Sequence, residues 1–174
     1  PTPSASASNI TDVSADFSWT AVPSATLGYE YVLDNVATDP AGSGTSTTAI
    51  TYSATGLTQL TTYYFHIRSV CSVGTYSNWS TVSFTTLATP PVNDNCASAT
   101  VLTPGATFAT SPLIATNVGA TGSAETAPGC ASYLGGDVWY SVVVPASGNL
   151  TFENRTNLGG MTDSAAAIYS GVCG

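Results

Sequence analysis

The 174-residue chain contains no lysine, and its two arginines face ten acidic residues, so the formal net charge is −8. Only 7% of the residues are charged, whereas about a quarter is typical of soluble domains. Nucleic-acid binding needs lysine and arginine to neutralise phosphates, so the composition excludes a nucleic-acid partner. Attachment to anionic membranes is disfavoured for the same reason.

Long apolar runs are also missing. No run approaches the ~20 residues that a membrane-spanning helix needs, so we expect no membrane insertion. No segment shows helical periodicity, and Pro1 opens directly on a strand-rich module without a secretory signal. The hydrophobic content of 43%, with 10% aromatic residues, is nevertheless ample for packed cores. The sequence therefore predicts an all-β piece of a larger protein.

Signals for metal binding and catalysis are sparse. The four cysteines, at positions 71, 96, 130 and 173, form no CxxC pair, which disfavours a zinc site. Their wide spacing in a strand-rich, lysine-free chain indicates an oxidising, extracellular compartment. His66 is the only histidine, and no GxSxG elbow accompanies it. We place His66 on the outward face of a strand, in a structural or solvated role, and expect no enzyme activity.

The segment from Gly56 to Thr86 predicts two strands joined by a short turn. Residues of the first strand alternate, and the face expected to be buried carries Tyr63, Phe65, Ile67 and Ser69. Val82 and Phe84 supply the inward face of the returning strand. The same half-buried alternation occurs earlier in the chain, at Ala15, Phe17 and Trp19 and at Tyr29, Tyr31 and Leu33.

These patterns carry a family resemblance. The stretch GLTQLTTYYFHIRSVCSVGTYSNWSTVSFTT and the motif ITDVSADFSWT resemble the closing half and the second strand of a fibronectin type III domain, and the resemblance covers residues 1–87. It implies that Trp19 is the core tryptophan. It also implies that Tyr63 is the tyrosine corner, whose hydroxyl bonds back to the preceding turn.

Arg68 and Trp79 lie on neighbouring strands of this module. A guanidinium over an indole would form a cation–π contact, and YSNWS resembles a reduced form of the WSxWS-type ladder of cytokine-receptor domains. The alternative is a sugar-stacking platform made of Trp79, Tyr76 and Tyr64. We favour the structural ladder.

Consecutive prolines in residues 88–92, ATPPV, predict an extended linker. A second module spans residues 93–174, with strands expected at 137–144, 150–152 and 165–169. The pattern NDNC…DVWYSVVVPASGNLTF…AAAIYSGVCG resembles secreted Bacteroidetes domains related to the bacterial pre-peptidase C-terminal β-sandwich. The resemblance implies a jelly-roll-like sandwich that normally continues past Gly174, so we expect its C-terminal part to be missing.

Candidate sites in this module follow from the same resemblance. It supports a disulfide between Cys96 and Cys130, although four cysteines allow three connectivities. Asp94 and Asp137 could contribute to a calcium site, with turn hydrogen bonding as the alternative, and no other cofactor is expected. Ser164, in Asp-Ser-Ala, matches a short bacterial O-glycosylation acceptor.

The sequence therefore indicates two tandem all-β sandwich modules of a large secreted or cell-surface bacterial protein, exported by the type IX route. We expect a structural or adhesive role that spaces and presents other domains. The alternative is a carbohydrate-binding accessory region of a secreted hydrolase. The expected partners are neighbouring domains of the same polypeptide, together with a glycan or protein ligand.

Overall fold

The computed structural model describes residues 1–107, 110, 112–123, 133, 135–155 and 165–171. The chain divides into two compact units, Pro1–Thr89 and Pro90–Gly174. The described residues form strands and one short 3-10 turn, with no α-helix among them. No helix in this part of the chain has the length and apolarity to cross a membrane.

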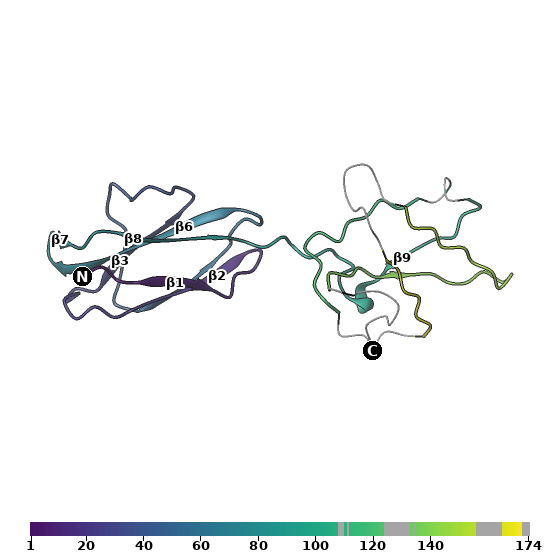
Figure 1. Cartoon of the computed structure of the whole chain (residues 1–174), viewed down its shortest axis with the longest axis horizontal. Coiled ribbons are helices and arrows are strands. Elements are labelled where there is room, and N and C mark those ends of the chain that lie inside the picture. Colours follow the sequence, from purple (N-terminus) through teal and green to yellow (C-terminus); the bar gives the residue numbers. More distant parts are fainter. Residues whose placement is uncertain (108–109, 111, 124–132, 134, 156–164, 172–174) are drawn as a thin grey trace. The chain divides into compact units, whose positions relative to one another are not determined.

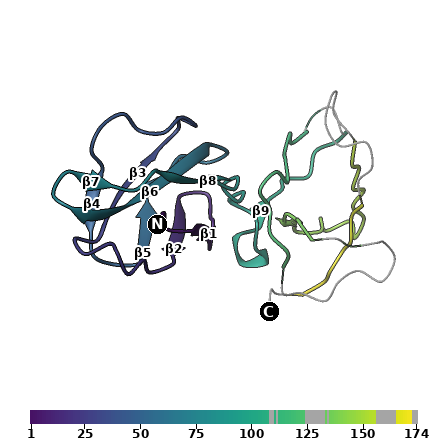
Figure 2. The ribbon, with the colours of Figure 1, turned by 60° about the vertical axis from the view of Figure 1, so that its left-hand side comes forward.

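The first unit is a two-layer β-sandwich with a fibronectin type III-like strand arrangement. One sheet has the order β1-β2-β5, and the other has the order β4-β3-β6, with β7 and β8 along the outer side of β6. Figure 2 shows β3, β6 and β8 lying above β1, β2 and β5. The strands are β1 (Ala5–Ser8), β2 (Ser14–Trp19), β3 (Tyr29–Asp34), β4 (Thr45–Thr47), β5 (Thr51–Thr55), β6 (Thr62–Ser72), β7 (Thr75–Tyr76) and β8 (Ser80–Thr85).

The core lies between the two sheets and follows the predicted alternation. Phe17 of β2 stacks on Phe65 of β6 with ring centres 4.2 Å apart, and Phe84 of β8 meets Phe17 edge-on. Phe65 and Ile67 are fully buried. Burying each such side chain stabilises the fold by about 1.5–3 kcal/mol, so the aromatic contacts between β2, β6 and β8 hold the layers together.

The chain enters and leaves the first unit at opposite ends of β6. Ser69 Oγ donates to the carbonyl of Pro1, near the C-terminal end of the strand. At its other end, Leu60 N donates to the carbonyl of Leu87, and Thr89 N donates to Gln59 Oε1. With a rise of about 3.3 Å per residue, these two positions are roughly 25 Å apart along β6. Figure 1 shows the N-terminus beside β7 and the chain leaving this sandwich at the other end.

The second unit has much less regular structure than predicted. Its described strands are β9 (Thr100–Val101) and β10 (Tyr140–Ser141), which pair in parallel, and a 3-10 turn, η1, covers Cys96–Ser98. The strands expected at 137–144, 150–152 and 165–169 were wrong in extent, because only Tyr140–Ser141 is a strand. The expected turn at PASG is present, where Gly148 N donates to the carbonyl of Pro145.

The difference has a physical reason. Alternating side chains show which residues could face a core, but a strand also needs a neighbour for its backbone groups. Val144 and Phe152, which alternation places on the side expected to face a core, are 53% and 50% exposed, so the described residues cover that side only in part. The jelly-roll-like arrangement of this unit stays a prediction.

Candidate functional site

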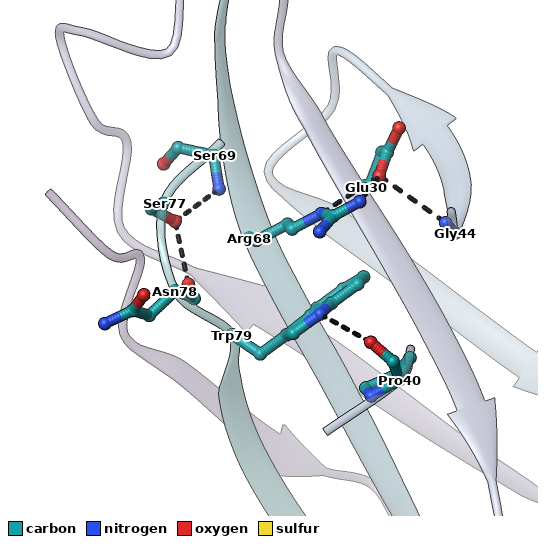
Figure 3. Close-up of polar contacts among 8 residues, drawn as sticks. All are labelled: Glu30, Pro40, Gly44, Arg68, Ser69, Ser77, Asn78 and Trp79. Carbon is teal, nitrogen blue, oxygen red and sulfur yellow. Dashed lines mark hydrogen bonds and ion pairs between the residues drawn. The ribbon is translucent and has the colours of Figure 1, made fainter. Parts of the chain in front are cut away.

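The outer face of β6 carries a cluster of aromatic and charged side chains, which we call the Arg68 ladder: Glu30, Arg68, Tyr76 and Trp79. The guanidinium carbon of Arg68 lies 4.0 Å from the ring centre of Tyr76 and 4.3 Å from that of Trp79. Trp79 Nε1 donates to the carbonyl of Pro40 at 3.1 Å, which fixes the indole beside the guanidinium (Figure 3). Each cation–π contact contributes about 0.5–1 kcal/mol, and more where water is excluded.

Glu30 completes the ladder from the neighbouring strand. It lies directly opposite Arg68 in the antiparallel pairing of β3 with β6. Arg68 donates to Glu30 Oε2 through Nε at 3.0 Å and through Nη2 at 2.7 Å. The two side chains are only 8% and 15% exposed, Glu30 being the more buried. A carboxylate this buried needs a cation, since leaving it unpaired would cost several kcal/mol.

A short turn between β7 and β8 holds the ladder in place. Ser69 N donates to Ser77 Oγ at 2.9 Å, and Ser77 Oγ donates to the carbonyl of Asn78 at 2.8 Å (Figure 3). The pairing of β6 with β7 shifts register between Val70 and Ser72. Next to this irregularity, Ser77 binds Ser69 twice, because Ser77 N also donates to the Ser69 carbonyl at 3.0 Å.

This geometry bears on the alternative of a sugar-stacking platform. One face of the Tyr76 ring and one face of the Trp79 ring are covered by the guanidinium of Arg68. Tyr64 instead lies beside His66, with ring centres 6.4 Å apart. The three aromatic rings therefore pack against their own protein neighbours.

His66 lies on the outer face of β6, where a structural or solvated role was predicted, and its full burial makes that role structural. Its Nε2 lies 3.0 Å from the carbonyl of Val36 and its Nδ1 lies 2.8 Å from Thr81 Oγ1. A carbonyl can only accept, so Nε2 is a donor. The segment after β3 supplies both the Val36 carbonyl and the Pro40 carbonyl that binds Trp79. Strand alternation could not reveal this segment folding over the outer face.

At the exit end of the first unit, Tyr63 and Thr86 fasten the chain to the turn before β6. Tyr63 Oη accepts a hydrogen bond from Thr58 N at 3.0 Å, and its ring stacks on Phe84. The buried Thr86 hydroxyl donates to the carbonyl of Thr58 at 2.6 Å and accepts from Thr61 N at 3.0 Å. The sequence singled out Tyr63 but missed Thr86, since a threonine in a Thr-rich chain carries no local signal.

Trp19 lies in the core between Tyr29 and Phe65, with ring centres 5.8 Å from each. It is 5% exposed. Its Nε1 is buried without a hydrogen-bond partner in the described part of the chain. Trp19 therefore acts through apolar packing.

In the second unit, Asp94 and Asp137 bind the same short segment. The Asp94 carboxylate accepts from Thr121 N at 2.6 Å and from Thr121 Oγ1 at 2.7 Å. The Asp137 carboxylate accepts from Ser123 N at 3.1 Å, from Ser123 Oγ, and from the Tyr133 hydroxyl. Burial raises the pKa of Asp137, but the bonds from Ser123 and Tyr133 outweigh it and leave the pKa below its usual value.

These contacts are of the turn-bonding kind that was the alternative to calcium. Within the described ranges, no three His, Cys, Asp or Glu side chains gather into a group that could hold a metal ion. The calcium site stays a prediction.

The structure describes two of the four remaining positions, Cys71 and Cys96. Cys71 is a free thiol at the end of β6, whereas Cys96 is not free. Cys130 and Ser164 lie outside the described residues. The Cys96–Cys130 disulfide and the glycosylation of Ser164 therefore stay predictions.

No family model matches the sequence, and no curated protein matches it. Many solved structures are similar to this chain, and three of them match over about half of it. A β-sandwich protein from a computer-based redesign is 25% identical and matches over 49% of this chain and 89% of its own, with a TM-score of 0.42. A myokine structure is 18% identical over 49% of this chain and 94% of its own, with a TM-score of 0.39.

The third is a segment of two fibronectin type III domains from chicken tenascin. It is 21% identical over 48% of this chain and 47% of its own, with a TM-score of 0.40. This chain thus matches about half the length of the tenascin segment. The fibronectin type III-like arrangement of the first unit rests on its own strand order and packing.

Proposed function

We propose that this chain is a non-catalytic structural region that spaces and presents neighbouring domains of an extracellular or cell-surface protein. The observation that carries the proposal is the position of the two ends of the first unit. Pro1 and Leu87 lie at opposite ends of β6. A module with this geometry adds its own length, roughly 25 Å, between whatever precedes and follows it.

The exit end is fastened in a way that suits this role. Thr86 binds the turn before β6, Leu87 N donates to the carbonyl of Thr11, and Thr89 Oγ1 donates to Asp12 Oδ2. Tension on the chain would therefore be shared among hydrogen bonds to two separate loops. Such bonds must break together before β8 can leave the sheet.

The composition supports the extracellular part of the proposal. A lysine-free chain with few charges and a strand-rich fold is consistent with export to an oxidising compartment. The resemblance of the NDNC-containing module to secreted Bacteroidetes domains adds export by the type IX route and an adhesive context. Folds of this class host many functions, so these finer features are part of the proposal.

The described chemistry of the first unit also fits a structural role. Its one histidine is buried and bound to Thr81 and the Val36 carbonyl, and its one arginine is bound to Glu30. A carbohydrate-binding accessory region is the second candidate. Tyr76 remains 40% exposed, so sugar contact at its uncovered face is the form this candidate would take.

Single-molecule force spectroscopy on the whole chain, held at its two ends, tests the spacing role. We expect the first unit to unfold in one cooperative event that releases about 280 Å of extended chain. Thr86→Val should lower the force of that event, because it removes a buried hydroxyl with two partners. Thr85→Val is the matched control, since its hydroxyl bonds only at the surface with Thr62.

Gradual extension without a cooperative event would contradict the spacing role. Reproducible turnover of peptide, ester or glycoside substrates by the chain would overturn the non-catalytic part. Glycan-array binding that disappears with Tyr76→Ala would favour the second candidate instead.

A further inference from the structure

Two tyrosines from opposite sheets meet at the open edge of the first unit. Tyr31 belongs to β3 and Tyr52 belongs to β5. Their ring centres lie 4.5 Å apart with planes tilted by 35°. Among the aromatic contacts of the first unit, this is the one between two tyrosines, and it joins strands of different sheets.

Both phenols open onto a shallow cavity. Its volume is about 440 Å³, and it is lined by Tyr31, Val32, Leu33, Ser43, Gly44, Thr45 and Tyr52. Three of these lining residues, Ser43, Gly44 and Thr45, are small. Gly44 is required there, because a Cβ at this position would lie 2.5 Å from the Tyr31 carbonyl oxygen. Small solutes can therefore reach the two rings while the rings stay packed on Phe65.

The proximity of Tyr52 also affects the phenol of Tyr31. Burial, the neighbouring Tyr52 charge and a side-chain hydrogen bond with Tyr52 together raise the pKa of Tyr31 above its usual value. The Tyr31 phenol therefore keeps its hydroxyl proton to a higher pH than an ordinary tyrosine does.

We propose that Tyr31 and Tyr52 form a site of oxidative cross-linking, at which a one-electron oxidant of the haem-peroxidase and peroxide class joins the rings as dityrosine. Radical coupling needs two phenols held side by side and open to an oxidant. The 4.5 Å contact supplies the first condition, and the cavity supplies the second.

The reaction balances with peroxide as the oxidant. Each phenol loses one electron and its hydroxyl proton and becomes a tyrosyl radical. The two radicals form one carbon–carbon bond between ring positions ortho to the oxygens, and each ring then moves its displaced ortho hydrogen to its own oxygen. The two electrons and two protons reduce one peroxide molecule to two waters.

The cross-link would close an edge that hydrogen bonds leave open. β5 pairs with β2, and β4 pairs with β3, while no backbone pairing joins β4 to β5. A covalent bond from β3 to β5 would tie the two layers together and would enclose the segment between Tyr31 and Tyr52 in a loop. Such a loop stabilises mainly by restricting the unfolded chain, which would strengthen the module whether or not it acts as a spacer.

Treating the whole folded chain with horseradish peroxidase and hydrogen peroxide tests the proposal. We expect dityrosine fluorescence in the monomeric fraction, a peptide pair that links Tyr31 to Tyr52, and a rise in the melting temperature of the first unit. Tyr31→Phe and Tyr52→Phe should each abolish the linked pair. Tyr64→Phe is the matched control and should keep it, because Tyr64 packs against His66 on another face.

Peptide mapping of the wild-type chain makes the test independent of how the variants fold. A monomer in which both tyrosines survive oxidation unlinked would overturn the proposal. So would dityrosine found only between chains, or only at other tyrosines. The force measurement on untreated protein is unaffected by these outcomes, so failure here leaves the spacing role standing.

Discussion

Arg68 Nη2 lies 2.7 Å from Glu30 Oε2, although 38 positions separate the two residues in the chain. The antiparallel register of β3 and β6 places them opposite each other. Both side chains are largely buried, and the rings of Tyr76 and Trp79 lie against the guanidinium of Arg68. The contact is therefore an ion pair that the fold itself creates, and it anchors the ladder on the outer face of the sheet.

Removing the Arg68 side chain should show how much the buried Glu30 carboxylate destabilises the first unit when it has no cation. We expect Arg68→Met to lower the free energy of unfolding of the first unit by about 3 kcal/mol, because Glu30 then loses its cation. The double variant Arg68→Met/Glu30→Leu should recover most of this loss. Urea unfolding of each variant gives the free energies for a double-mutant cycle.

The other arginine provides the control. Arg155 pairs with Glu153 at 2.6 Å, but its side chain is 62% exposed. Arg155 lies in the second unit, and exposed pairs contribute only about 0–1 kcal/mol. Arg155→Met should therefore leave the free energy of unfolding of the first unit unchanged. An equal effect of the two arginine substitutions would contradict the role given to the Arg68 ladder.

Tyr63→Phe should destabilise the first unit more than Tyr64→Phe does. The Tyr63 hydroxyl accepts from Thr58 N, and losing such a bond costs about 1 kcal/mol. The structure shows no side-chain hydrogen bond for Tyr64 among the described residues. Tyr64→Phe therefore removes the same hydroxyl group without breaking such a bond. The chemical denaturation midpoints of the two variants provide the comparison, and equal midpoints would refute the corner assignment.

Asp137 should make the second unit sensitive to acid. Its pKa is lowered in the folded chain, so its contribution to stability is present above the ordinary aspartate pKa, about 3.9, and is lost as the pH falls through the lower, folded value. We expect Asp137→Asn to weaken the second unit at neutral pH and to flatten its acid dependence.

The indole N–H signal of Trp139 reports on this region in NMR spectra, because Trp139 Nε1 donates to Ser123 Oγ, which in turn bonds to Asp137. The Trp79 signal in the same spectra serves as the control for the first unit and should keep its pH profile. A Trp139 signal with the same acid transition in wild type and Asp137→Asn would show that this carboxylate does not stabilise the unit.

The mature protein should contain a disulfide between Cys96 and Cys130. Non-reducing peptide mapping should identify that linked pair, while Cys71 should react with thiol reagents as a free cysteine. A link between Cys96 and a different cysteine would replace this connectivity. Free thiols at both positions after oxidative export would contradict the pairing and weaken the extracellular proposal.

The prediction of the first unit succeeded where the alternation of side chains along a single strand was sufficient. The alternation at Ala15, Phe17 and Trp19 and at Phe65 and Ile67 specifies one buried face in any sheet, and all five side chains are buried in the core. For His66 the sequence left a structural and a solvated role open, because burial of an outer face depends on what crosses it. The Val36 and Pro40 carbonyls come from a segment with no strand pattern of its own.

The sequence by itself determined the all-β class, the inward faces of β2, β3, β6 and β8 and the shortage of positive charge, since these depend on composition and on the period of two along a strand. Tertiary structure alone decided the contacts between distant strands. The register of β3 on β6 paired Glu30 with Arg68, and the approach of the two sheets at their open edge brought Tyr31 onto Tyr52. In the second unit the alternating pattern was not enough, because a strand forms only where another backbone meets its hydrogen-bonding groups.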